Sequence, residues 1–225
     1  MRSVMFTEPL TEPLAETMDE EARTPSAGRW RLWIDRCGGF DIWLGDQLSI
    51  GGSGGSTPAD FAIRCGWPNP VAVLIRSASG DWLLPAEEVA ETNDSHGAET
   101  DRGPQPLLAD QILEFPWLPP ALRTAAFPKI RYRRPSPLSR SAVLMVLPPH
   151  RTLAPTDGMV LMDQTLLLGP EPFNHVCTPG LSSQQWVLFR RADQWWIRGQ
   201  SLAPRPLLIG QRWQADDWAL SIRPA

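Results

Sequence analysis

The sequence has one tyrosine, three cysteines, three histidines and very little lysine, and its apolar runs are short. The cysteines are odd in number and show no CxxC spacing, which does not fit the disulfide framework of a small secreted domain. We therefore expect reduced thiols in a cytoplasmic protein. The longest apolar run, residues 142–147, is far too short to cross a bilayer, and the first residues lack the apolar core of a signal peptide. We expect no membrane partner.

The chain also lacks the patterns that catalysis, metal binding and nucleic-acid binding require. His96, His150 and His175 have no acid, nucleophile or second ligand at a suggestive spacing. The net charge of −4 and the pI of about 5.4 oppose a nucleic-acid partner, because such binders carry a basic face. We expect a protein that is not an enzyme and that uses no cofactor and no metal.

Proline and tryptophan are abundant, with 24 and 11 residues, and both shape the predicted fold. Frequent proline excludes long helices, and short alternating apolar runs bounded by Gly, Pro and Asp are typical of strands. The sequence therefore predicts an all-β fold. The predicted strands include residues 29–35, 40–44, 48–50, 59–63, 71–76, 82–84, 130–135 and 141–147. The runs 40–44 and 48–50 are predicted to form one hairpin, and 71–76 and 82–84 another.

Two segments are too polar to be part of a core. Residues 1–27 are acidic and carry a short duplication, Thr7-Glu8-Pro9-Leu10 followed by Thr11-Glu12-Pro13-Leu14. Such a segment buries too little apolar surface to offset its ordering entropy, so we expect a disordered N-terminal tail. Residues 86–105 are also polar and acidic, and we expect a disordered insert between strands.

The second half of the chain repeats the pattern of the first. Residues 158–169 match residues 39–51, with Asp-Gln at the same turn, and residues 186–198 match residues 71–84. Further along, Pro206-Leu207-Leu208 matches Pro106-Leu107-Leu108. Because these matching segments occur in the same order in both halves, the sequence predicts two tandem copies of one all-β unit. We place the copies at residues 28–135, which include the polar insert, and at residues 139–225.

The unit resembles the forkhead-associated (FHA) domain. The resemblance rests on a strand ending in Ile50-Gly51, on Ala59-Asp60 followed by Ile63, on Ile75-Arg76, and on Trp82-Leu83-Leu84. It implies two tandem FHA-like β-sandwiches, most similar to the degenerate double modules of bacterial FHA proteins. It further implies a signalling role through a protein or phosphopeptide partner, since the family binds phosphothreonine through loops at one end of the sandwich.

Departures from the family pattern weaken this phosphate site. The arginine that follows Ile-Gly in the family is Gly52 in the first copy and Pro170 in the second, and the family's serine and histidine are Asn69 and Ala72, then Ser183 and Trp186. A phosphate dianion needs convergent charge-assisted donors. The candidate ligand-binding residues are Gly52, Ser53, Ser56, Asn69 and Arg76 in the first copy, and Ser182, Ser183 and Arg190 in the second.

Two functional interpretations follow from the sequence. The first is a non-catalytic protein–protein interaction module with a degenerate phosphothreonine site, which docks a partner through loops or a strand edge. The alternative is a sandwich that binds carbohydrate or peptide through exposed tryptophans. We expect Trp33, Trp43, Trp82 and Trp196 in the core, and Trp67 and Trp117 exposed in their Pro-containing loops.

Overall fold

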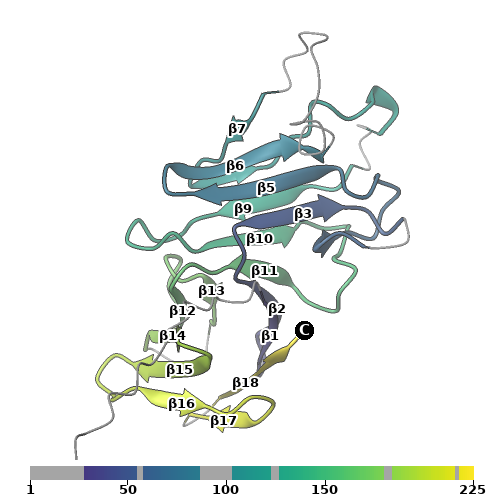
Figure 1. The fold of residues 1–225 in the computed structure, drawn as a ribbon. Helices are drawn as coiled ribbons and strands as arrows, with labels where there is room; N and C mark the ends of the chain where they lie inside the picture. The colour runs from purple at the N-terminus through teal and green to yellow at the C-terminus, as the bar shows by residue number, and fades with distance from the viewer. Residues whose placement is uncertain (1–27, 55–57, 87–102, 123–126, 180–183, 216–217) are drawn as a thin grey trace, which may run out of the picture.

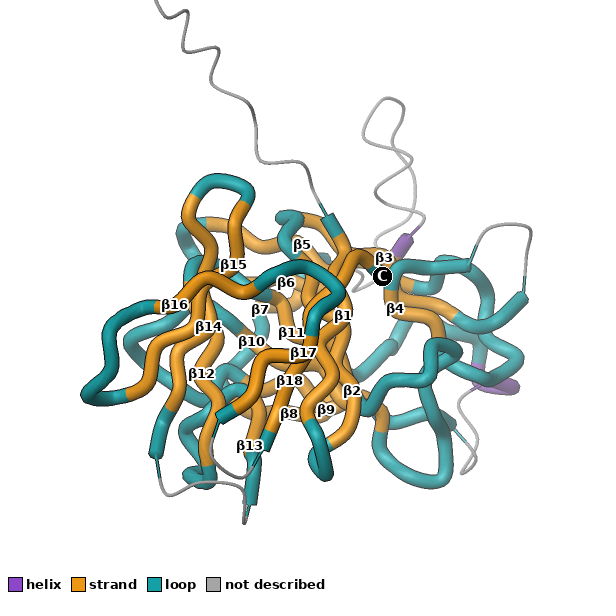
Figure 2. The backbone as a smooth tube through the Cα atoms, turned by 90° about the horizontal axis from the view of Figure 1, so that it is seen from below, coloured by secondary structure: helices purple, strands orange, loops and turns teal. Residues whose placement is uncertain are grey.

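The computed structural model describes residues 28–54, 58–86, 103–122, 127–179, 184–215 and 218–225. These residues form an all-β structure of three sheets, with one short 3-10 helix, η1 (Pro120–Leu122). Strands and the loops between them make up nearly all of the described backbone (Figure 2). The predicted all-β class is confirmed. The predicted disordered tail, residues 1–27, and most of the predicted insert at 86–105 lie outside the described residues.

The largest sheet has eight strands and joins both halves of the chain. Its order is β17-β18-β1-β2-β11-β10-β9-β8, and all neighbouring pairs are antiparallel except β2 and β11. The strands are β1 (Arg29–Ile34), β2 (Gly38–Trp43), β8 (Asp110–Ile112), β9 (Ile130–Arg133), β10 (Ala142–Val146), β11 (Gly158–Leu161), β17 (Arg212–Gln214) and β18 (Ala219–Pro224).

Two five-stranded sheets lie at opposite ends of the molecule (Figure 1). The first has the order β4-β3-β5-β6-β7 and contains β3 (Gln47–Gly51), β4 (Phe61–Ala62), β5 (Ala72–Ser77), β6 (Gly80–Pro85) and β7 (Gln105–Pro106). The second has the corresponding order β13-β12-β14-β15-β16. It contains β12 (Thr165–Gly169), β13 (Val176–Cys177), β14 (Trp186–Arg191), β15 (Gln194–Gly199) and β16 (Arg205–Leu207).

The five-stranded sheets pack on opposite faces of the central sheet. Side chains alternate between the two faces of a strand, and two hydrophobic clusters divide β11 accordingly. Val160 belongs to the cluster that contains Leu166 and Leu188, whereas Met159 and Leu161 belong to the cluster with Leu48 and Leu74. The molecule therefore consists of two sandwich-like layers that share one continuous sheet.

The two hairpins of the central sheet cover the five-stranded sheet of the other half of the chain. Hairpin β1–β2 pairs with β18 and packs on the sheet that contains β12, β14 and β15, whereas β10–β11 pairs with β9 and packs on the sheet that contains β3, β5 and β6. We call β3–β11 unit A, and β12–β18 with β1–β2 unit B. The predicted boundaries between the two sequence copies, at residues 135 and 139, follow the sequence repeat. The two hydrophobic cores instead belong to units A and B, each of which includes a hairpin from the other half of the chain.

One predicted hairpin is wrong. Residues 40–44 and 48–50 were expected to pair, but β2 pairs with β1 and β11 in the central sheet, while β3 pairs with β4 and β5. The Gly45-Asp46 connection passes from one sheet to another, and Met162-Asp163 makes the same crossing between β11 and β12. The predicted hairpin of 71–76 with 82–84 is confirmed as β5–β6.

The exchange of hairpins predicts where a core substitution acts. Ile42→Val removes one methylene from β2 and should cost about 1 kcal/mol. In hydrogen-exchange mass spectrometry this should raise exchange about fivefold in residues 165–199 of unit B and much less in residues 47–85. The matched variant Leu161→Val, in β11, should do the reverse. If Ile42→Val raised hydrogen exchange mainly in residues 47–85, hairpin β1–β2 would not pack on the sheet of unit B, which would contradict this arrangement.

Two further sequence predictions concern cysteines and membranes. All three cysteines are free thiols in the structure, as their number and spacing predicted. In the described part of the chain, no helix has the length and apolar character needed to cross a membrane.

Candidate functional site

The candidate residues of the first copy are only partly brought together. Gly52, Ser53 and Asn69 lie at the end of β3, where the β4–β5 loop packs over the β3–β4 loop. The amide of Gly52 donates to Pro68 O at 3.0 Å, and the amide of Ser53 donates to Cys65 O at 3.4 Å. These backbone donors are used within the protein, so they are not directed at an external anion. Ser56 lies outside the described residues.

In unit A, the position at which the FHA resemblance predicts an arginine has no room for a side chain. A Cβ atom built on Gly52 would lie 2.3 Å from the carbonyl oxygen of Trp67. Any residue larger than glycine would therefore require the loop backbone to shift. At the matching position of unit B, Pro170 has no amide hydrogen to donate. Neither unit offers the family's arginine at this place.

Arg76 is far from these loops and has structural partners. It lies at the opposite end of β5, where it is 7% exposed, and it donates to Met162 O at 3.3 Å and to Arg140 O at 2.6 Å. Its guanidinium also lies 3.7 Å from the buried carboxylate of Asp81. Arg76 thus joins β5 to the segments that lead into and out of β10–β11.

The candidates of the second copy are also not assembled by the described residues. Ser182 and Ser183 lie outside them. Arg190 lies near the far end of β14, where its guanidinium is 5.6 Å from the ring centroid of Trp195 and 5.8 Å from that of Trp30. It also forms an ion pair with Asp193 at 3.4 Å. Arg190 is therefore part of an aromatic packing cluster.

The predicted exposure of Trp67 is wrong, because this residue is 4% exposed. Its ring packs against Phe115 and Phe127, with centroid distances of 5.0 and 4.7 Å. Trp117 is half-buried, and its indole N–H donates to Val71 O at 3.0 Å. These aromatic side chains cover one end of the core of unit A. The tryptophans expected in the core, Trp33, Trp43, Trp82 and Trp196, are half-buried instead.

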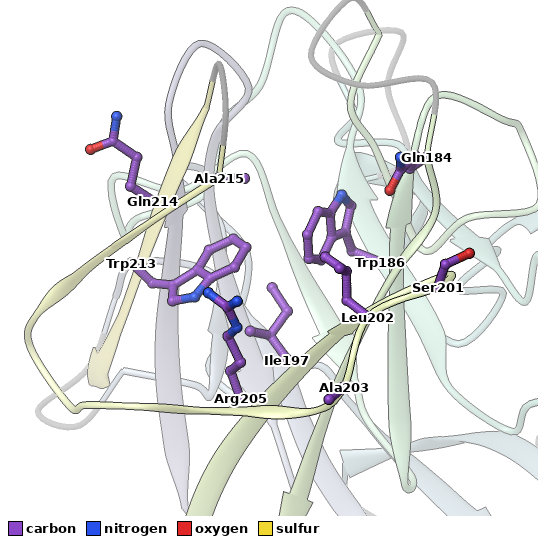
Figure 3. A pocket seen from close by; sticks show the side chains of 10 residues that line it. All are labelled: Gln184, Trp186, Ile197, Ser201, Leu202, Ala203, Arg205, Trp213, Gln214 and Ala215. Carbon is purple, nitrogen blue, oxygen red and sulfur yellow. The ribbon is translucent and has the colours of Figure 1, made fainter.

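An open pocket lies at the matching end of unit B, where the edge strands β16 and β17 approach each other (Figure 3). Its volume is about 630 Å³, within the range of ligand sites in proteins. We call it the Trp pocket. Trp186 and Trp213, both labelled in Figure 3, line it with rings that contact each other. The lining residues are Gln184, Trp186, Ile197, Ser201, Leu202, Ala203, Arg205, Trp213, Gln214 and Ala215.

The tryptophans of the pocket are held by edge-to-face packing. Trp186, Trp213 and Trp218 contact one another with centroid distances of 5.2 to 5.7 Å and interplanar angles of 70 to 73°. Trp186 and Trp218 are buried, whereas Trp213 is half-buried and forms a wall that a ligand can reach. Such rigid aromatic surfaces bind with little loss of side-chain entropy and are frequent at binding hot spots.

Among the described residues that line the pocket, Arg205 is the charged one. It is exposed on the edge strand β16, and its side chain rises toward Trp213 in Figure 3. Its guanidinium makes no hydrogen bond or ion pair with any residue that the structure describes. The indole nitrogen of Trp186 is buried, and none of the described residues accepts a hydrogen bond from it. The pocket thus combines apolar walls with one exposed cationic donor, the Arg205 guanidinium.

The pocket's main residues were missed by the sequence analysis. Trp186 was considered only as the counterpart of a family histidine, and neither Trp213 nor Arg205 was singled out. A signal was present in the repeat, because residues 113–129 separate β8 from β9, whereas residues 215–218 separate β17 from β18. The connection in unit B is thus much shorter than its counterpart in unit A.

The described residues contain no group of three or more His, Cys, Asp or Glu side chains arranged to hold a metal ion. The Trp pocket, with its aromatic walls and the exposed guanidinium of Arg205, is the candidate functional site. No protein-family model matches the chain, and neither the curated proteins nor the solved structures include one that is significantly similar to it.

Proposed function

We propose that this chain is a non-catalytic protein-interaction module that resembles FHA domains, with a degenerate phosphothreonine site and with the Trp pocket as its docking site for a partner peptide. The observation that carries the proposal is the proximity of Trp213, a half-buried aromatic wall, to the guanidinium of Arg205, which has no ion-pair or hydrogen-bond partner among the described residues. Trp and Arg are the residues most enriched at hot spots of protein interfaces.

The geometry of the phosphate loops supports a degenerate site. Phosphate recognition needs several charge-assisted donors that converge on one point. In unit A the amides of Gly52 and Ser53 are bonded to loop carbonyls, and Arg76 lies at the other end of β5. In unit B Arg190 packs on Trp30 and Trp195. These positions favour docking in the Trp pocket, independent of phosphorylation.

A displayed random peptide library, with phosphothreonine and unmodified arms, tests this function on the full chain. We expect capture of peptides from both arms at similar levels, because the pocket offers aromatic contacts and one cation. Trp213→Ala should weaken the selected peptides at least tenfold, since removal of an interface tryptophan costs about 2 kcal/mol or more. Arg198→Glu, on the exposed end of β15 and outside the Trp pocket, is the matched control and should bind normally.

Two results would contradict the proposal. If capture required phosphothreonine and were unchanged by Trp213→Ala, the binding site would lie at the loops that carry Gly52, Ser53 and Asn69. If neither arm yielded a binder to the folded chain, peptide docking would be excluded under these conditions. Circular dichroism and thermal melting of Trp213→Ala would show that loss of binding is not loss of fold.

A further inference from the structure

The end of unit B that holds the Trp pocket can be compared with the corresponding end of unit A. β3 and β12 both end on glycine, Gly51 and Gly169, and the residues before these glycines pair with Ala72 and Trp186. The strand register then matches Leu83 with Ile197, and Gln105 with Arg205. The sequence matches Gln111 with Gln211, and thus Leu113 with Trp213. The walls of the Trp pocket therefore have counterparts in unit A.

In unit A this region is covered by the chain itself. Residues 113–118, Leu-Glu-Phe-Pro-Trp-Leu, follow β8, and Leu113, Phe115 and Leu118 are at most 4% exposed in the core cluster. Phe115 packs on Trp67, and the indole N–H of Trp117 donates to Val71 O. A short segment with aromatic residues on both sides of a proline closes the end of the sandwich.

Among the described residues of unit B, no segment provides a corresponding cover. The counterpart of Phe115 is Ala215, which lines the Trp pocket, and the chain reaches β18 directly after residues 215–218. Trp186 stands at the position of Ala72 and also lines the pocket. The remaining volume of about 630 Å³ is open beside Trp213 and Arg205.

We propose that the Trp pocket takes a partner segment of the type that covers unit A: an acidic residue followed by an aromatic–proline–aromatic sequence, as in residues 114–117. This inference rests on the proposed function and specifies its ligand. The aromatic side chain enters the pocket and packs against the reachable face of Trp213, where aromatic pairs gain beyond simple burial. Proline holds the segment extended, which lowers the entropy lost on binding.

Charge complementarity specifies the acidic residue. Gln105 in unit A is neutral, whereas its counterpart Arg205 is positively charged and has no described partner. Of the described residues that line the pocket, Arg205 alone carries a charge. A glutamate next to the inserted aromatic residue, in the place that Glu114 has beside Phe115, pairs with this guanidinium in the bound state.

The test uses a fluorescein-labelled peptide with the sequence of residues 113–120, Leu-Glu-Phe-Pro-Trp-Leu-Pro-Pro, and the full chain in a fluorescence anisotropy titration. We expect saturable binding that falls at least tenfold with Trp213→Ala and at least tenfold when the peptide's phenylalanine is replaced by alanine. Arg205→Glu should weaken binding about fivefold, and a peptide with lysine in place of glutamate should recover most of that loss. Arg198→Glu should leave the affinity unchanged.

The outcomes separate this inference from the proposed function. If library-selected peptides bind at the Trp pocket but the 113–120 peptide does not, the ligand class is wrong and the docking function stands. If the 113–120 peptide binds equally well to wild type and Trp213→Ala, it occupies another surface, such as unit A, and the inference is overturned. If no library peptide and no 113–120 peptide binds, both proposals fail.

Discussion

Asp81→Ala is expected to lower the free energy of unfolding by about 3–5 kcal/mol, the usual cost of removing one partner from a buried charged pair. The Asp81 carboxylate is 3% exposed, accepts the hydroxyl of Tyr132 at 2.7 Å and lies 3.7 Å from the Arg76 guanidinium. Alanine would leave the buried charge of Arg76 without its counterion and the Tyr132 hydroxyl without an acceptor. Urea unfolding followed by far-UV circular dichroism measures the loss.

Two variants show which interaction dominates. Asp81→Asn keeps an oxygen acceptor for Tyr132 but removes the charge, so it should cost less than Asp81→Ala. Tyr132→Phe removes the hydroxyl alone and should cost about 1 kcal/mol, as for a single hydrogen bond. The double variant Asp81→Ala with Tyr132→Phe should lose less free energy of unfolding than the sum of the losses of Asp81→Ala and Tyr132→Phe, because the two residues share one network. Strict additivity would show that the 2.7 Å hydrogen bond contributes little to stability.

The strands could be predicted because their signals are local. Alternation of apolar and polar residues in 29–35 and 71–76 reflects one buried face, and the structure places β1 and β5 there. The tight turn between β5 and β6 has Gly80 at a φ of 141°, a conformation that favours glycine. Local chemistry therefore specifies which residues extend and where the chain reverses.

The pairing of the hairpins could not be predicted from such signals. β1–β2 has the same alternating pattern whether it covers the sheet of its own half or that of the other half. The choice is made by the Gly45-Asp46 and Met162-Asp163 connections, which cross between sheets, and by the parallel pairing of β2 with β11. Both arrangements bury the same side chains, so hydrophobicity alone does not distinguish them.

The exposure of the tryptophan side chains also could not be predicted from local sequence. Trp67 lies between prolines and glycines, which predicts an exposed loop, yet it is buried because Phe115 and Phe127 from a distant segment pack on it. Trp213 lies in a strand and remains half-buried because the connection after β17 is short. Exposure of these residues is decided by what packs on them, and their own neighbours in sequence carry no information about that.

His175 is expected to make the protein acid-sensitive between about pH 6.5 and pH 4. Its side chain is 1% exposed, and Nδ1 accepts the amide of Leu167 at 2.9 Å. Burial lowers the pKa of His175 from 6.5 to about 4, and the nearby Arg133 contributes in the same direction. The neutral imidazole is therefore the form that the folded state accommodates.

The direction of the pH dependence follows from this lowered pKa. Below pH 6.5 the unfolded chain binds a proton at His175 that the folded chain does not bind until about pH 4, so acid favours unfolding. The stabilising contribution is complete above pH 6.5 and is lost as the pH falls toward 4. The difference between a pKa of 6.5 in the unfolded chain and about 4 in the folded chain corresponds to about 3 kcal/mol in the free energy of unfolding. Stability should be measured by urea unfolding at several pH values from 7 to 4.

His175→Asn separates this residue from the carboxylates, which also titrate in acid. The asparagine Oδ1 can replace Nδ1 as acceptor for Leu167 but carries no titratable proton, so the variant should lose stability at pH 7 and show a shallower decline between pH 6.5 and 4. Arg133 from β9 holds the same loop through the carbonyls of Pro172, Asn174 and His175. Protonation of His175 would place a second positive charge beside it. Equal slopes for wild type and His175→Asn would assign the acid sensitivity to other groups.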